Sequence, residues 1–98
     1  MIYKYQIFQL KENAASKMFL SFDRLAKYGH TFDIKDYDEV YSGEIEGGNS
    51  EYFVLEDLFE IFNVRRPEDF KGHSLSTSDV VVLNGTMYYC NSLGWKKL

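Results

Sequence analysis

Cysteine, proline and histidine are scarce in this 98-residue chain, which contains one, one and two of them. A lone cysteine excludes an internal disulfide and a cysteine-based structural zinc site, and it fits a reducing compartment. Long apolar runs are also missing, because no stretch approaches the ~20 residues that span a bilayer, and the opening residues lack the pattern of a signal peptide. We therefore expect a protein of the cytoplasm that does not enter a membrane.

The residues that are present are typical of one packed domain. Hydrophobic residues make up 45% of the chain and aromatic residues 17%. This balance is that of a globular chain rather than a disordered one, and the length leaves room for a single core. We expect residues 1–98 to fold as one domain.

Alternating and β-branched residues predict an antiparallel sheet. The segments with this character are 2–10, 37–46, 80–83, 86–90 and 95–98. Asn84-Gly85 is a strong signal for a hairpin near the C-terminus, and Ser42-Gly43 predicts a bend or bulge within residues 37–46.

Two short helices are expected between the strands. The first begins after Ser21 and ends at Gly29, with Phe22, Leu25 and Ala26 on one face. The second follows the Gly47-Gly48 joint, and its predicted apolar face consists of Leu55, Leu58, Phe59 and Phe62. The order of elements predicts the α+β class: a small single domain with an antiparallel β-sheet, a C-terminal hairpin and two short helices.

Negative charge is concentrated in the middle of the chain. Between Asp33 and Glu60 there are ten acidic residues and one cation, Lys35, although the net charge of the chain is only −4. This acidic segment would repel phosphate backbones and attract basic protein surfaces, so direct binding of nucleic acid is disfavoured. The alternative interpretation is a solvated face that keeps the protein soluble. The candidate partner-binding residues are Asp36, Asp38, Glu39, Tyr41, Glu44, Glu46, Glu56, Asp57 and Glu60.

Aromatic residues add to the case for a protein interface. Eight tyrosines and eight phenylalanines exceed what a core of this size needs, so some rings are expected at the surface. Exposed tyrosines are frequent anchors of protein interfaces.

No catalytic signature is found. His73, Ser74, Ser76 and Asp79 are close in sequence, whereas catalytic triads are assembled from separate elements. We predict instead that Asp79 and the hydroxyl groups bond to the backbone in a compact turn, with His73 bonded to the backbone nearby. Cys90 is predicted to be a buried, inert thiol.

Signals for metals and cofactors are equally weak. Asp33, Asp36 and Asp38 lack both the spacing and the glycine of a calcium loop. Gly47-Gly48 is not followed by the lysine and hydroxyl residue of a phosphate-binding loop. We expect no cofactor and no metal ion.

Three stretches together resemble the YodL-like domain. They are DLFEIFN at 57–63, RPEDFKGHSLSTSDVVVL at 66–83 and YYCNSLGW at 88–95, and residues 2–44 resemble the family more loosely. The resemblance implies a domain found across Firmicutes, often within larger proteins of conjugative and other mobile elements and beside antirestriction modules. It assigns no catalytic role to His73 or Asp79.

By analogy with that neighbourhood, we expect a non-enzymatic, protein-binding accessory module of a mobile genetic element. It would act through an acidic face as an anti-CRISPR or antirestriction inhibitor, and its partner would be a nucleic-acid-binding host-defence complex. One alternative is a small hydrolase built around His73 with Ser74 or Ser76. The other is a nucleic-acid-associated accessory domain that uses Lys4, Lys11, Lys17, Arg65, Arg66, Lys96 and Lys97.

Overall fold

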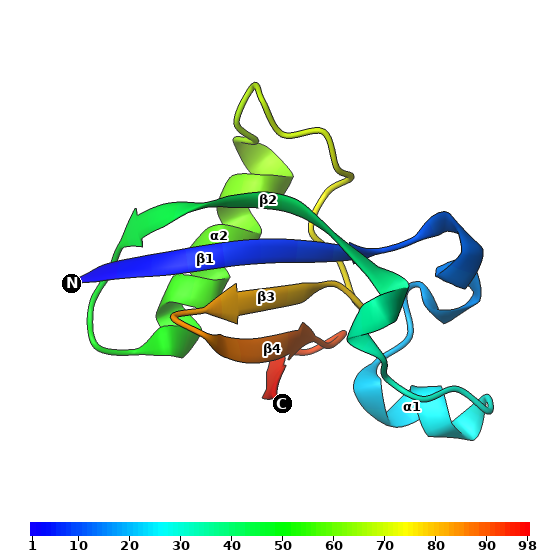
Figure 1. The fold of residues 1–98 in the computed structure, drawn as a ribbon. Coiled ribbons are helices and arrows are strands. Elements are labelled where there is room, and N and C mark those ends of the chain that lie inside the picture. Colours follow the sequence, from blue (N-terminus) through cyan, green and yellow to red (C-terminus); the bar gives the residue numbers. More distant parts are fainter.

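A computed structural model describes all of residues 1–98 and contains one five-stranded antiparallel sheet with a helix across one of its faces (Figure 1). The strands lie in the order β2-β1-β3-β4-β5. Their bounds are β1 Ile2–Leu10, β2 Tyr37–Glu46, β3 Val80–Leu83, β4 Thr86–Cys90 and β5 Trp95–Lys97. The predicted α+β class, the antiparallel sheet and the C-terminal hairpin are confirmed.

The two predicted helices are α1 (Phe22–Lys27) and α2 (Glu51–Val64), and two short 3-10 turns, Glu12–Lys17 and Ile34–Asp36, complete the set. Helix α2 buries Val54, Leu55, Leu58 and Phe62 against the sheet. The prediction that Phe59 belongs to the buried face is wrong, because its side chain lies at the exposed margin of that face. Its ring lies 6.5 Å from that of Trp95. None of the helices has the length and apolar character that crossing a bilayer requires.

Strand β1 is an inner strand of the sheet and lies between β2 and the β3–β4 hairpin. Its odd-numbered side chains Tyr3, Tyr5 and Ile7 are buried in the core beneath α2. Since successive side chains of a strand point to opposite faces, Ile2, Lys4 and Gln6 lie on the other face of the sheet. The loose alternation in the sequence therefore describes a strand with one face fully buried.

The bulge in β2 lies two residues earlier than the sequence suggested. Ser42 and Gly43 pair regularly with Gln6 and Tyr5, and the unpaired extra residue is Val40. Gly43 is needed for a different reason: a Cβ atom there would lie 2.8 Å from the Tyr5 hydroxyl oxygen. The glycine makes room for a ring of the core and does not bend the strand.

The face of the sheet opposite α2 is covered at one end only. A second core of Leu10, Leu25, Tyr37, Val80 and Tyr89 forms where α1 and the 12–17 turn pack at the end of β1 (Figure 1). Near the beginning of β1, the same face exposes Ile2 and Lys4, and nothing packs over them. We call this uncovered part of the sheet the open face.

Candidate protein-binding edge of the sheet

Strand β2 forms one edge of the sheet and pairs only with β1. The bonds at the end of β2 show which of its residues are hydrogen-bonded to β1. There, Met1 and Gly47 form two backbone hydrogen bonds with each other, of 2.9 and 3.2 Å. In an antiparallel pair such bonded positions alternate with positions whose N–H and C=O groups point away from the partner. In register with Met1 and Gly47, the bonded residues of β2 are Ile45, Gly43 and Tyr41.

The remaining residues, Ser42, Glu44 and Glu46, therefore turn their backbone N–H and C=O groups toward the free edge. A hydrogen bond on the other side of β1 supports the same alternation of bonded and outward-facing residues. Lys4, the partner of Glu44, directs its backbone toward β3, where its carbonyl oxygen accepts the Asn84 N–H at 2.8 Å. No other segment of the chain pairs with the outer edge of β2.

The side chains of these outward residues lie on the open face. Glu44 is the cross-strand partner of Lys4, and Glu46 is the partner of Ile2, so both carboxylates point away from α2. Both glutamates are exposed, and neither forms an ion pair. Glu39 lies on the same face, where its Oε1 accepts a hydrogen bond of 2.5 Å from Gln6 Nε2. We call Glu39, Glu44 and Glu46 the β2 acids.

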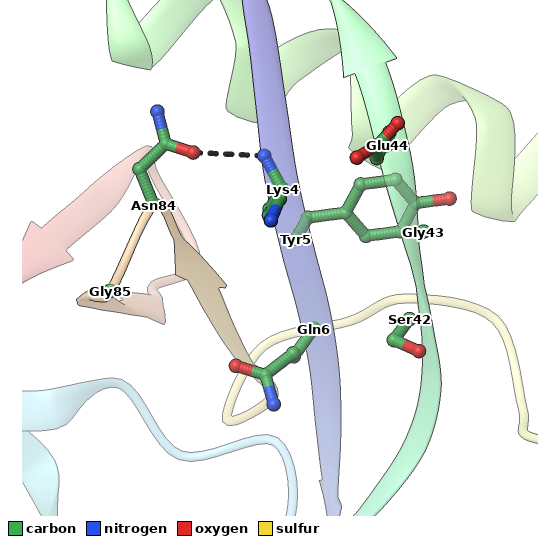
Figure 2. A pocket seen from close by; sticks show the side chains of 8 residues that line it. All are labelled: Lys4, Tyr5, Gln6, Ser42, Gly43, Glu44, Asn84 and Gly85. Carbon is green, nitrogen blue, oxygen red and sulfur yellow. Dashed lines mark hydrogen bonds between the residues drawn. The ribbon is translucent and has the colours of Figure 1, made fainter.

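A shallow hollow of about 590 Å³ lies beside Glu44 on the open face (Figure 2). Its walls carry one cation, one carboxylate, two amides and one hydroxyl. These groups suit the recognition of polar or charged side chains, and they contain no nucleophile with an adjacent base. The side chains belong to Lys4, Gln6, Ser42, Glu44 and Asn84, and the backbone at Tyr5, Gly43 and Gly85 completes the lining.

The other acidic candidates lie elsewhere. Glu56, Asp57 and Glu60 are on the exposed side of α2, which is across the sheet from the β2 acids, and we call them the α2 acids. Asp36 forms an ion pair with Lys17, and Asp38 is exposed at the beginning of β2. The acidic segment thus contributes to two separate surfaces.

Tyr41 is half-buried, and its ring packs against the core. Its ring lies 5.4 Å from that of Phe62 and 5.8 Å from that of Phe70, and its hydroxyl donates to Asp69 Oδ1 at 2.9 Å. The acceptance of this hydrogen bond by Asp69, followed by desolvation, raises the pKa of Tyr41. Its side chain points toward α2 and away from the β2 acids.

A buried polar cluster joins β1 to the loop before β3. Gln9 Nε2 donates to the His73 carbonyl at 2.8 Å and to Asp79 Oδ2 at 3.1 Å, while Gln9 Oε1 accepts the His73 N–H at 3.1 Å. Asp79 Oδ2 also accepts the Ser76 N–H at 2.9 Å, as the predicted compact turn requires. Burial raises the pKa of Asp79 to about 7, against the opposing effect of these hydrogen bonds.

The same cluster lacks the geometry of a hydrolase. His73 Nδ1 lies 2.8 Å from the Ser74 carbonyl oxygen, and Nε2 lies 4.0 Å from Asp79 Oδ1. The His73 ring has only Gln9 Nε2 and the Ser74 carbonyl oxygen within hydrogen-bond distance, so it is not bonded to the Ser76 hydroxyl as a catalytic base would be. Gln9 was missed in the sequence because its partners are 64 and 70 positions away.

Cys90 lies within β4, beneath α2. Burial raises the pKa of its thiol to about 12, which keeps it protonated, so the prediction of a buried thiol is confirmed. No group of three histidine, cysteine or carboxylate side chains is close enough to hold a metal ion.

The basic candidates are distributed over several elements of the fold. Lys4 and Lys11 are at opposite ends of β1, separated by about 23 Å of extended chain. Arg65 and Arg66 follow α2, and Lys96 and Lys97 are on β5 at the far edge of the sheet. Lys17 is already paired with Asp36.

Comparison with known proteins gives one match. A family model described as the YodL-like domain matches residues 4–98, a range that includes both helices and all five strands except the first two residues of β1. No curated protein and no solved structure matches the chain. Within the segment that carried the resemblance, Phe70, Leu75 and Asp79 are buried and hold the loop on the sheet. The chain belongs to the YodL-like domain family.

Proposed function

We propose that the chain is a non-enzymatic protein-binding module that recognises a basic partner through the β2 acids. The observation that carries this proposal is the state of Glu44 and Glu46, which are exposed, unpaired and carried on a strand whose outer edge is free. Unpaired surface carboxylates attract a cationic surface and steer its approach. The α2 acids are exposed too, but they lie on a helix whose backbone groups are already bonded within the helix.

In the cell we place this module in the cytoplasm, as an accessory of a mobile genetic element that inhibits a host-defence complex. CRISPR and restriction complexes bind nucleic acid through basic clefts, and an acidic strand competes for such a cleft. The support for this finer assignment is the analogy with the neighbourhood of the family.

The two alternatives have less support. A nucleic-acid-binding role requires a continuous basic surface, whereas the candidate cations are distributed over separate elements. A hydrolase around His73 requires a serine hydroxyl bonded to the imidazole, and neither the Ser74 nor the Ser76 hydroxyl is hydrogen-bonded to it.

A phage plating assay tests the proposal. Hosts that carry a CRISPR or a restriction system would express the wild type, the double variant Glu44→Lys/Glu46→Lys or the matched variant Glu56→Lys/Glu60→Lys. Each variant changes the net charge by the same amount, on the β2 acids in one case and on the α2 acids in the other. We expect the wild type and the α2 variant to raise the efficiency of plating, and the β2 variant to lose this effect.

Capture of the tagged protein with the defence complex, washed at low and high salt, accompanies the assay. Binding through the β2 acids weakens as salt rises, because exposed charges are screened. Wild-type protein that protects phage in no host would overturn the anti-defence assignment. Loss of protection in the α2 variant alone would overturn the assignment of the site to β2.

A further inference from the structure

The outer edge of β2 is a row of unpaired backbone groups. Ser42, Glu44 and Glu46 each direct an N–H and a C=O away from β1, and successive members of this row are about 7 Å apart along the strand. Such an edge is a template for one more strand. The bulge at Val40 limits the regular part of the edge to residues 41–46.

We propose that the partner binds by strand addition: an extended segment pairs with β2 between Ser42 and Glu46 and becomes the sixth strand of the sheet. This inference rests on the proposed function, because it assumes a basic partner. It adds the binding mode, which is pairing of the partner's backbone with β2. In this mode the backbone hydrogen bonds provide the contact, and alternate side chains provide the specificity.

The side chains of β2 define the sequence of the added strand. Residues that pair directly with Ser42, Glu44 and Glu46 point to the open face, where the carboxylates of Glu44 and Glu46 are free. Opposite charges on directly paired residues stabilise a sheet, so these positions favour lysine or arginine. The hollow beside Glu44 leaves room for their long aliphatic stems.

The intervening residues of the added strand face the other way. They lie beside Tyr41 and Ile45, which are half-buried against the core under α2. Apolar or β-branched side chains fit this position. The structure therefore assigns to the partner a segment of about five residues in which basic and apolar residues alternate.

A second copy of the chain fits this edge poorly. Pairing of β2 with β2 would place Glu44 and Glu46 beside the same acids of the other copy, and like charges directly opposite destabilise a sheet. Strand β5 carries Lys96 and Lys97 but has only three residues. A separate partner with a basic strand is the occupant that the charges favour.

Synthetic peptides test the inference directly. The first has the sequence Lys-Val-Lys-Thr-Lys-Val-Lys with blocked ends, and the second has the same composition with its lysines grouped together. In a nuclear magnetic resonance titration, we expect the first peptide to shift the amide protons of Ser42, Glu44 and Glu46 and to protect them from exchange. The amides of Gly43 and Ile45, already bonded to β1, should change little.

Methylation of the peptide backbone separates strand addition from simple charge attraction. The N–H groups of the lysines point toward β2, so N-methylation of the lysines should abolish binding. N-methylation of the valines and the threonine affects only N–H groups on the outer side and should leave binding intact. Equal binding of the grouped or lysine-methylated peptide would overturn strand addition and leave the proposed function standing.

A variant of the protein gives the reciprocal test. Ser42→Pro removes one outward N–H without changing the charge, and proline is tolerated on an edge where that group is unpaired. We expect loss of peptide binding with retained protection of the Gly43 and Ile45 amides; binding equal to that of wild type would count against the inference. If this variant does not fold, the methylated peptides decide the question. Self-association of the free protein, detected as slower diffusion at higher concentration, would instead assign the edge to a second copy.

The plating assay distinguishes the two levels of the proposal. If phage protection depends on the β2 acids while no peptide protects the outward amides, strand addition fails and the binding module remains. If neither the β2 acids nor the α2 acids affect protection or capture, the proposed function itself fails.

Discussion

Gln9 and Asp79 are joined by a hydrogen bond of 3.1 Å although they are separated by 70 positions in the sequence. The Gln9 amide fills the space between β1 and the loop before β3, and it satisfies both the Asp79 carboxylate and the backbone of His73. This contact fastens the loop before β3 to β1, and it makes the stability of the fold depend on one buried acid.

Asp79→Asn should weaken the dependence of stability on pH. Burial raises the folded-state pKa of Asp79 to about 7, well above its value in an unfolded chain. The folded state therefore binds the proton more tightly, so this contribution to stability is complete below about pH 4 and is lost as the pH rises to about 7. The full contribution is on the order of 4 kcal/mol.

The measurement is the melting temperature of wild type and Asp79→Asn between pH 4 and pH 8. Wild type should lose stability relative to the variant as the pH rises through this window. The imidazole of His73, 4.0 Å from Asp79 Oδ1, lowers the pKa of that carboxyl, so His73→Ala measured in parallel isolates its share. A constant difference between wild type and Asp79→Asn would contradict the prediction.

Gln9→Ala should destabilise the fold by about 1–3 kcal/mol, because it leaves the His73 N–H and part of the Asp79 carboxylate without a partner in a buried site. Gln6→Ala is the matched control, since Gln6 bonds only to exposed Glu39 on the open face. We expect it to cost less than about 1 kcal/mol. Urea denaturation gives both values, and equal values would show that the buried cluster does not contribute.

Gly43→Ala should destabilise the protein by about 1–3 kcal/mol, the range for overpacking of a core. Its Cβ atom would lie 2.8 Å from the hydroxyl oxygen of Tyr5, whose ring is packed against Tyr41 and Phe62. Gly48→Ala is the control, because an added Cβ atom there meets nothing within 4 Å. Comparable melting temperatures for the two variants would mean that the Tyr5 ring moves freely.

Tyr41→Phe should leave partner binding unchanged and cost less than about 1 kcal/mol, since it removes only an exposed hydrogen bond to Asp69. Tyr41→Ala also removes the contacts with Phe62 and Phe70 and should cost about 2–3 kcal/mol. Unfolding by urea measures the stabilities, and capture of the defence complex measures binding. Loss of binding in a stable Tyr41→Phe protein would restore this residue to the interface.

Local signals in the sequence predicted the elements well. Asn84 and Gly85 adopt φ angles of 48° and 82°, as the turn of a tight hairpin requires. The Asn-Gly pair alone is enough to predict that turn. The apolar spacing in residues 55–62 likewise predicted α2. Periodicity did not fix which neighbour lies at the margin of the buried face, however, and for that reason Phe59 was assigned to the core.

Contacts between distant segments could not be predicted from the sequence. The bulge at Val40 and the role of Gly43 depend on where the Tyr5 ring lies, and the partners of Gln9 come from a loop far along the chain. The acidic segment was visible as a run of charge, but the run passes from β2 through Gly47-Gly48 to α2. The chain crosses from one side of the sheet to the other at that point, so neighbouring acids in the sequence became separate surfaces.

The carboxylates on the free edge of β2 also bear on how the protein behaves in concentrated solution. An unpaired strand edge is a site from which sheets aggregate, and charged side chains on such an edge act as gatekeepers against that process. Glu39, Glu44 and Glu46 serve in this way at neutral pH. Replacing the same carboxylates with neutral side chains would remove the repulsion between copies and leave the unpaired edge as a site for fibril growth.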